Sequence, residues 1–175
     1  MTSGPRYADR RDFPPYAFLP GGSEPHPTQH PEGHSFTTEA EPPADYLEPD
    51  LWQENEDYLF GVDLYNHGYL WEAHEVWEGL WHAAKHDAVQ ADLLQGLIQC
   101  AAAALKVPME QPGGLEKLAR VGTERLEGVA RRGGHKYMGI DLLDFVGAFR
   151  EFAASRPQSA DERPPIELGE LGELG

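Results

Sequence analysis

The placement of proline constrains this chain more than any other feature of its sequence. Most of the 15 prolines lie at or before Pro49 or after Arg156, and a proline inside a helix removes a backbone hydrogen bond and clashes with the preceding turn. The segment between them, about 105 residues, has the common size of one domain. We expect a disordered, proline-rich arm over residues 1–45, a helical domain over residues 46–155 and a flexible acidic tail over residues 156–175.

The expected arm contains a regular run of histidines, His26, His30 and His34, one every four residues. Pro27 and Pro31 stand between them, and because proline breaks a helix, this spacing does not bring the three imidazole rings to one face. We interpret the run as part of a polar linker, with a metal-binding histidine tract as the alternative.

The central segment contains five stretches with the apolar period of an α-helix. Leu115, Leu118 and Ala119 begin a stripe that continues along one face through residues 115–132. The other stretches cover about residues 51–66, 69–85, 88–106 and a segment that begins near residue 141. No stretch alternates with a period of two, so strands are not expected. Short links between helices favour antiparallel neighbours, and we expect an all-α fold, a compact antiparallel bundle of about five helices.

Two of these helices begin with the same signal, an aspartate followed three residues later by a glutamine. Asp50 precedes Gln53, and Asp87 precedes Gln90. An aspartate just before a helix accepts hydrogen bonds from the free N–H groups of its first turn. We therefore expect Asp50 and Asp87 to cap their helices.

The charge of the chain limits its partners and its compartment. The formal net charge is −16, which opposes binding to nucleic acid and to anionic membranes and favours cationic partners such as metal ions. No run reaches the roughly 18 apolar residues of a membrane span, and the start of the chain lacks the apolar stretch of a secretory signal. The single cysteine, Cys100, fits a reducing compartment. We expect a cytoplasmic protein with no nucleic-acid or membrane partner.

Residues 69–82 divide into two unlike halves when they are placed on a helical wheel. One half, with Ala73, Trp77 and Leu80, is an ordinary core face. The other half mixes two indoles with acids and imidazoles: Trp71, Glu72, His74, Glu75, Glu78, Trp81 and His82. Large apolar groups are seldom left exposed beside charges. We therefore expect Trp71 and Trp81 to be covered by another helix, the arm, a second subunit or a ligand.

The spacing on this half places an imidazole beside carboxylates. His74 and Glu78 are four residues apart, and Glu75 and Glu78 are three apart, so their side chains are neighbours. His74 and Glu78, in a set that also includes Glu75 and His82, are candidate ligands of a divalent metal. His74, Glu75 and Glu78 are candidate catalytic residues for proton transfer. The alternative is a buried polar network. The metalloprotease pattern would need histidine at position 78, and the di-iron Glu-x-x-His pattern is absent.

Gln95 and Gln99 lie four residues apart on the next helix, beside a strip of alanines, and either line a pocket or face the surface. Our first hypothesis is a small-molecule or metal-binding, hydrolytic site, to which Glu72, Trp71, Trp81, Gln95 and Gln99 contribute binding groups. The alternative is a non-catalytic interaction or scaffold protein that uses the Trp-rich face, with a homo-oligomer as its expected form.

Two sequence motifs resemble one family of domains. They are Asn66-His67-Gly68-Tyr69-x-x-Glu72-Ala73-His74-Glu75-x-Trp77-Glu78-x-x-Trp81 and Leu94-Gln95-Gly96-Leu97-Ile98-Gln99. Over roughly residues 59–126 the chain resembles the domain of unknown function 309 family. The resemblance implies a compact all-α domain from a bacterial or archaeal cytoplasm. It implies no activity, because the family is named for lacking an established one, and it implies nothing for the arm or the tail.

Overall fold

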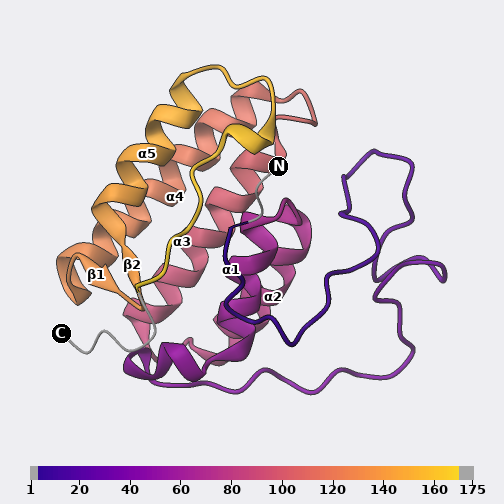
Figure 1. Ribbon diagram of the computed structural model, residues 1–175, viewed down its shortest axis with the longest axis horizontal. Coiled ribbons are helices and arrows are strands. Elements are labelled where there is room, and N and C mark those ends of the chain that lie inside the picture. The colour runs from indigo at the N-terminus through magenta and orange to yellow at the C-terminus, as the bar shows by residue number, and fades with distance from the viewer. Residues whose placement is uncertain (1–3, 170–175) are drawn as a thin grey trace.

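The computed structural model describes residues 4–169, and they form a bundle of α-helices with long irregular segments at both ends (Figure 1). The elements in chain order are the 3-10 helix η1 (Pro49–Glu54), the helices α1 (Glu56–Asn66), α2 (Leu70–Ala83), α3 (Ala88–Leu105) and α4 (Pro112–Gly133), the strands β1 (Lys136–Tyr137) and β2 (Ile140–Asp141), the helix α5 (Leu142–Ala154) and the 3-10 helix η2 (Ala160–Glu162). The expected all-α bundle is confirmed.

Helix α3 forms the centre of the bundle, packed between α2 and α4. Its close approach to α4 depends on two glycines. A side chain at Gly96 would lie 2.6 Å from Leu126, and one at Gly122 would lie 3.1 Å from the backbone of Gly96. By length and composition alone α3 is apolar enough to cross a membrane, with a mean hydropathy of 1.3. Half of it is buried inside the bundle, so its central place accounts for its apolar character.

The two expected helix caps have different outcomes. Asp87 caps α3, because its side chain accepts a hydrogen bond from the backbone N–H of Gln90. Asp50 does not cap the first long helix as expected. It lies inside η1, the chain bends at its end, and Asn55 caps α1 by accepting from the N–H of Tyr58.

A small antiparallel hairpin between α4 and α5 was not expected. Strands β1 and β2 pair Lys136 with Asp141 and Tyr137 with Ile140. With two residues each, they are too short to show a period of two. The turn between them uses Met138 and Gly139, both with positive φ.

The arm has no helix or strand over residues 4–45, which agrees with its proline content. Part of it loops out beside α2 (Figure 1), but several of its residues contact the bundle. Its main anchor is Asp63 of α1, which is completely buried. The carboxylate accepts hydrogen bonds from Nε of Arg6 at 3.0 Å and from the backbone N–H groups of Tyr7 and Ala8, both at 2.8 Å. Composition predicts the lack of regular structure here and does not predict this packing.

The tail is also attached to α1 over its described part, residues 156–169. The guanidinium group of Arg163 donates to the carbonyl oxygens of Tyr65 and Asn66 at the end of α1. The side chain of Asn66 both donates to and accepts from the backbone of Ile166, at 2.9 and 2.8 Å. These contacts pack residues 163–166 against the end of α1, and the residues after 169 lie outside the described range.

Candidate functional site

Helix α2 turns its two halves in the directions that the helical wheel predicts. Ala73, Trp77 and Leu80 are buried in the core. Trp77 is accommodated because Gly61 of α1 has no side chain, and a Cβ there would lie 2.1 Å from the indole nitrogen. This close contact fixes the rotation of α2, so that its acidic half faces the arm and the surface.

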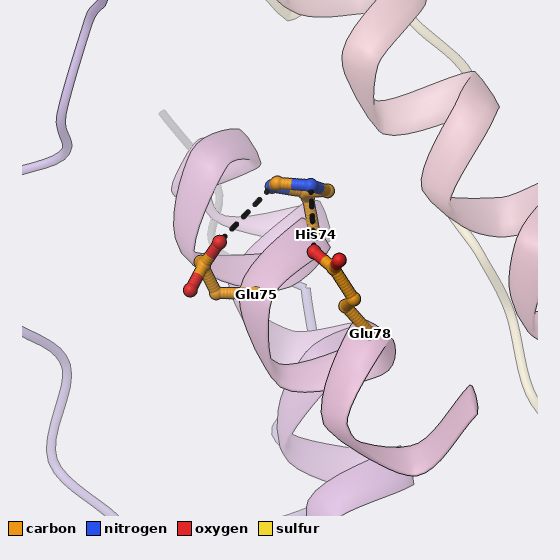
Figure 2. A group of neighbouring side chains, drawn as sticks. All are labelled: His74, Glu75 and Glu78. Atoms are coloured by element: carbon orange, nitrogen blue, oxygen red, sulfur yellow. Dashed lines mark ion pairs between the residues drawn. The ribbon is translucent and has the colours of Figure 1, made fainter. Parts of the chain in front are cut away.

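The acidic half carries a compact group of His74, Glu75 and Glu78 (Figure 2). Nε2 of His74 lies 3.2 Å from Oε2 of Glu78, and Nδ1 lies 3.8 Å from Oε1 of Glu75. One potential ligand atom from each residue lies within 4.8 Å of the other two. The imidazole is 31% exposed, so this group, named here the His74 cluster, is accessible from solvent.

The carboxyl group of Glu75 is the most electrostatically perturbed member of the cluster. Its partial burial raises its pKa above the ordinary value, and the neighbouring charges of Glu78 and Glu41 add to the rise. His74 and His26 oppose it. A carboxylate whose pKa is raised is a better proton acceptor than one with the ordinary pKa.

Glu72, one turn earlier, forms a buried polar contact with the arm. Its Oε2 lies 2.7 Å from Nε2 of His34 and accepts a hydrogen bond from the backbone N–H of Phe18 at 2.9 Å. The side chains of His34 and Glu72 are only 2% and 5% exposed. The second oxygen of Glu72, Oε1, is buried and has no hydrogen-bond partner in the described part of the protein.

A cavity of about 270 Å³ separates the arm from α1 and α2 at this point. Arg11 and Glu41 come from the arm, and Glu75 belongs both to the cavity wall and to the His74 cluster. The complete lining consists of Arg11, Pro14, Thr28, His34, Ser35, Glu41, Phe60, Leu64, Trp71, Glu72, Glu75 and Val76.

The arm covers Trp71, one of the two indoles expected to be covered. The ring of Phe18 meets the indole edge-on at 5.4 Å between centroids, and the ring of His26 does so at 5.2 Å. Of the alternatives for the cover at Trp71, namely another helix, the arm, a second subunit or a ligand, the structure places the arm there.

Three other expected site residues lie apart from the His74 cluster. Trp81 is partly buried and has Nζ of Lys85 over its ring at 4.6 Å. Gln99 accepts a hydrogen bond from Nε of Arg125 on α4, so it faces α4. Gln95, one turn before it, is half-buried and does not line the cavity beneath the arm.

Sequence reasoning missed the contribution of the arm to this region. His26 and His34, interpreted as linker residues, contact Trp71 and Glu72, whereas His30 between them is exposed. The proline argument was correct in that the three rings do not share a helix face. Proline content does not predict the path of an irregular segment, and here that path places two of the three rings against α2.

A comparison with protein-family models gives a match over the helix that carries this site. Residues 58–118 match the model described as Domain of unknown function (DUF309). The match covers less than half of the chain and supports the resemblance to this family over that segment. No curated protein and no solved structure matches the chain. The matched part begins within α1 and ends early in α4. The His74 cluster and Glu72 therefore lie inside the match, whereas the arm lies outside it.

Proposed function

We propose that the segment of this chain that matches DUF309 binds a divalent metal ion on α2, through His74, Glu75 and Glu78, and a small molecule in the adjoining cavity. The observation that carries the proposal is the convergence of an imidazole nitrogen and two carboxylates within 4.8 Å on an accessible helix face. Imidazole and carboxylate together suit zinc, iron or manganese.

The spacing of the closest pair supports this assignment. In a tetrahedral site with bonds of about 2.1 Å, neighbouring ligand atoms lie about 3.4 Å apart. Nε2 of His74 and Oε2 of Glu78 lie 3.2 Å apart, so an ion fits between them without a change in the helix. Glu75 lies beside the other ring nitrogen, Nδ1, at 3.8 Å, and would join the set by a rotation of its side chain (Figure 2). Three ligands from one helix leave the opposite side of the ion open, as catalytic metal sites require.

The position of Glu75 links the ion to the cavity and favours hydrolysis as the reaction class. A divalent ion at this place would lower the pKa of a bound water molecule. Glu75 lines the cavity, so a water molecule bound to the ion beside Glu75 would face a small molecule held there. Arg11, at the same wall, is paired with Asp57 and lies over the ring of Phe60.

The scaffold alternative receives less support from the surface of α2. It requires a Trp-rich face that is free to meet a partner, but Phe18 and His26 already cover Trp71. A partner would first have to displace the arm.

Zinc and manganese titrations of chelator-treated protein test the proposal. We expect binding of one ion per chain by calorimetry, weakened at least about tenfold in His74→Ala and in Glu78→Gln, because each loses one ligand. His82→Ala is the matched control: His82 is an exposed histidine of the same helix that is not part of the cluster. Absence of binding by the unaltered protein, or equal affinities in His74→Ala and His82→Ala, would overturn the proposal.

A further inference from the structure

A second cavity, larger than the one beneath the arm, lies among α3, α4 and α5 and shares no residue with the His74 cluster. It has a volume of about 740 Å³ and opens between the end of α3, the first half of α4 and the end of α5. Cavities of about 300–1,000 Å³ commonly hold small organic ligands. Its size and position raise the question of which ligand chemistry it would accept.

The floor of this cavity is apolar. Leu115 and Ala119 of α4 are buried beneath it, at 5% and 3% exposure, and Val107 and Ala153 extend the apolar surface on either side. An apolar ligand body placed there would gain the free energy of removing this surface from water.

The rim of the cavity is basic, in a protein whose net charge is −16. Four basic side chains line it, Lys106, Arg120, Arg150 and Arg156, against two acidic ones, Glu110 and Glu116. Arg150 is already neutralised by Glu127 outside the cavity. Within residues 4–169, neither Arg120 nor Arg156 has an ion-pair partner. Two guanidinium groups are therefore available to an anion at the rim.

Arg156 stands at the rim in a costly backbone conformation. It follows the last capping residue of α5, with a φ of 55°, where glycine is preferred because its backbone adopts positive φ without strain. Glu110, on the other side of the cavity, has a φ of 57°. Glycine at either position would give a more stable turn. Turn stability therefore does not account for an arginine at one position and a glutamate at the other.

We propose that this cavity binds an amphiphilic anion, a small molecule with an apolar chain and one carboxylate or phosphate group. The chain would lie on Leu115 and Ala119, and the anionic group would lie between Arg120 and Arg156. The site is independent of the metal proposed on α2, so either proposal can fail without the other.

Titration of the full chain with decanoate and with decyl phosphate, below their micelle concentrations, is the first experiment. We expect saturable binding of at least one of them by calorimetry, shifts of the amide signals of residues 106–123 in NMR spectra, and much weaker binding of uncharged decanol. The proposal is overturned if neither anion binds saturably, if decanol binds equally well, or if the shifts lie elsewhere.

Charge reversal at two places on α4 locates the anionic group. Arg120→Glu should weaken binding about tenfold or more, because a repulsive charge replaces an attractive one near the surface. Arg131→Glu changes the net charge equally, eleven residues farther along α4 at an exposed position that does not line the cavity. Its effect should be below about twofold, since distant exposed charges are screened. Equal effects of the two reversals would contradict the site.

Two glycine substitutions separate binding from stability. Arg156→Gly and Glu110→Gly should both raise the melting temperature, because each relieves a positive φ. Their effects on the anion should be opposite, with affinity lowered in Arg156→Gly and raised in Glu110→Gly, which removes an acid from the rim. If both variants keep the original affinity, the arginine has no binding role and the proposal fails.

Discussion

Nε2 of His34 in the arm lies 2.7 Å from Oε2 of Glu72 on α2, and solvent reaches almost none of either side chain. The backbone N–H of Phe18 donates to the same oxygen. A residue 38 positions away thus closes the arm over the acidic half of α2. His34 and Glu72 both line the cavity, so this contact forms part of its wall.

We predict that His34→Ala opens the arm. Leaving a buried polar group without its partner costs about 1–3 kcal/mol, a factor of roughly 5 to 150 in the open population. A glutamate-specific protease should then cleave after Glu24 or Glu32 faster by a factor in this range. His30→Ala, at an exposed histidine of the same arm, should leave the cleavage rate unchanged. Equal rates in the two variants would show that the arm is held by other contacts.

Asp63 provides the second attachment of the arm, and we predict that it is the more important one for stability. Asp63→Asn keeps the shape of the side chain but loses the charge that Arg6 and two backbone N–H groups contact. Hydrogen bonds to a buried charge contribute about 1.5–3 kcal/mol, so the free energy of unfolding in urea should fall by about this amount. Asp57→Asn removes the charge of an exposed pair with Arg11 and should cost less than about 1 kcal/mol. Similar losses of unfolding free energy in the two variants would contradict the greater importance of Asp63.

Alanine substitutions of two glycines on neighbouring helices should have opposite effects on stability. Gly61→Ala forces a methyl group into Trp77, and overpacking of this kind costs about 1–3 kcal/mol. Gly79→Ala, on α2, meets open space and should stabilise the protein by about 0.5–1 kcal/mol, because alanine is the better helix former. Thermal unfolding of both variants tests the packing of α1 on α2. A stable Gly61→Ala variant would mean that the two helices are farther apart.

The pair between Glu127 on α4 and Arg150 on α5 should make stability depend on acid pH. Hydrogen bonds from Arg150 lower the pKa of the Glu127 carboxyl below its ordinary value of 4.5. The folded state therefore binds this proton less readily than the unfolded state. The contribution of the pair is complete above pH 4.5 and is lost as the pH falls through the lowered pKa. Glu127→Gln should reduce the slope of stability against pH below 4.5, and Glu124→Gln, at an exposed position, should not.

The helices were predictable because their signals are local. The Asp-x-x-Gln pattern marks the true start of α3, where Asp87 accepts from the N–H of Gln90. The same pattern at Asp50 failed because the chain forms a 3-10 helix there and bends at Asn55. The sequence contains both capping residues, and the choice between them depends on how η1 packs.

The candidate site was predictable in part. Helical spacing alone brings His74 to Glu78, since both lie on one helix. The wheel also places Gln99 on a definite face of α3, but it does not say which neighbour that face meets, and Gln99 meets Arg125 of α4. The partners of Asp63 and Glu72 lie 38 to 57 residues away in irregular chain. No periodic pattern connects positions so far apart.

The attachment of both ends of the chain to α1 has a consequence for folding during synthesis. Asp63 receives the arm early, but Asn66 binds Ile166, and the N–H of Leu168 donates to the hydroxyl of Tyr7. The contact between Asn66 and Ile166 forms only after a further 100 residues have been made, because the two positions are that far apart along the chain. Until then the end of α1, next to the helix that carries the His74 cluster, stays open to chaperones and proteases.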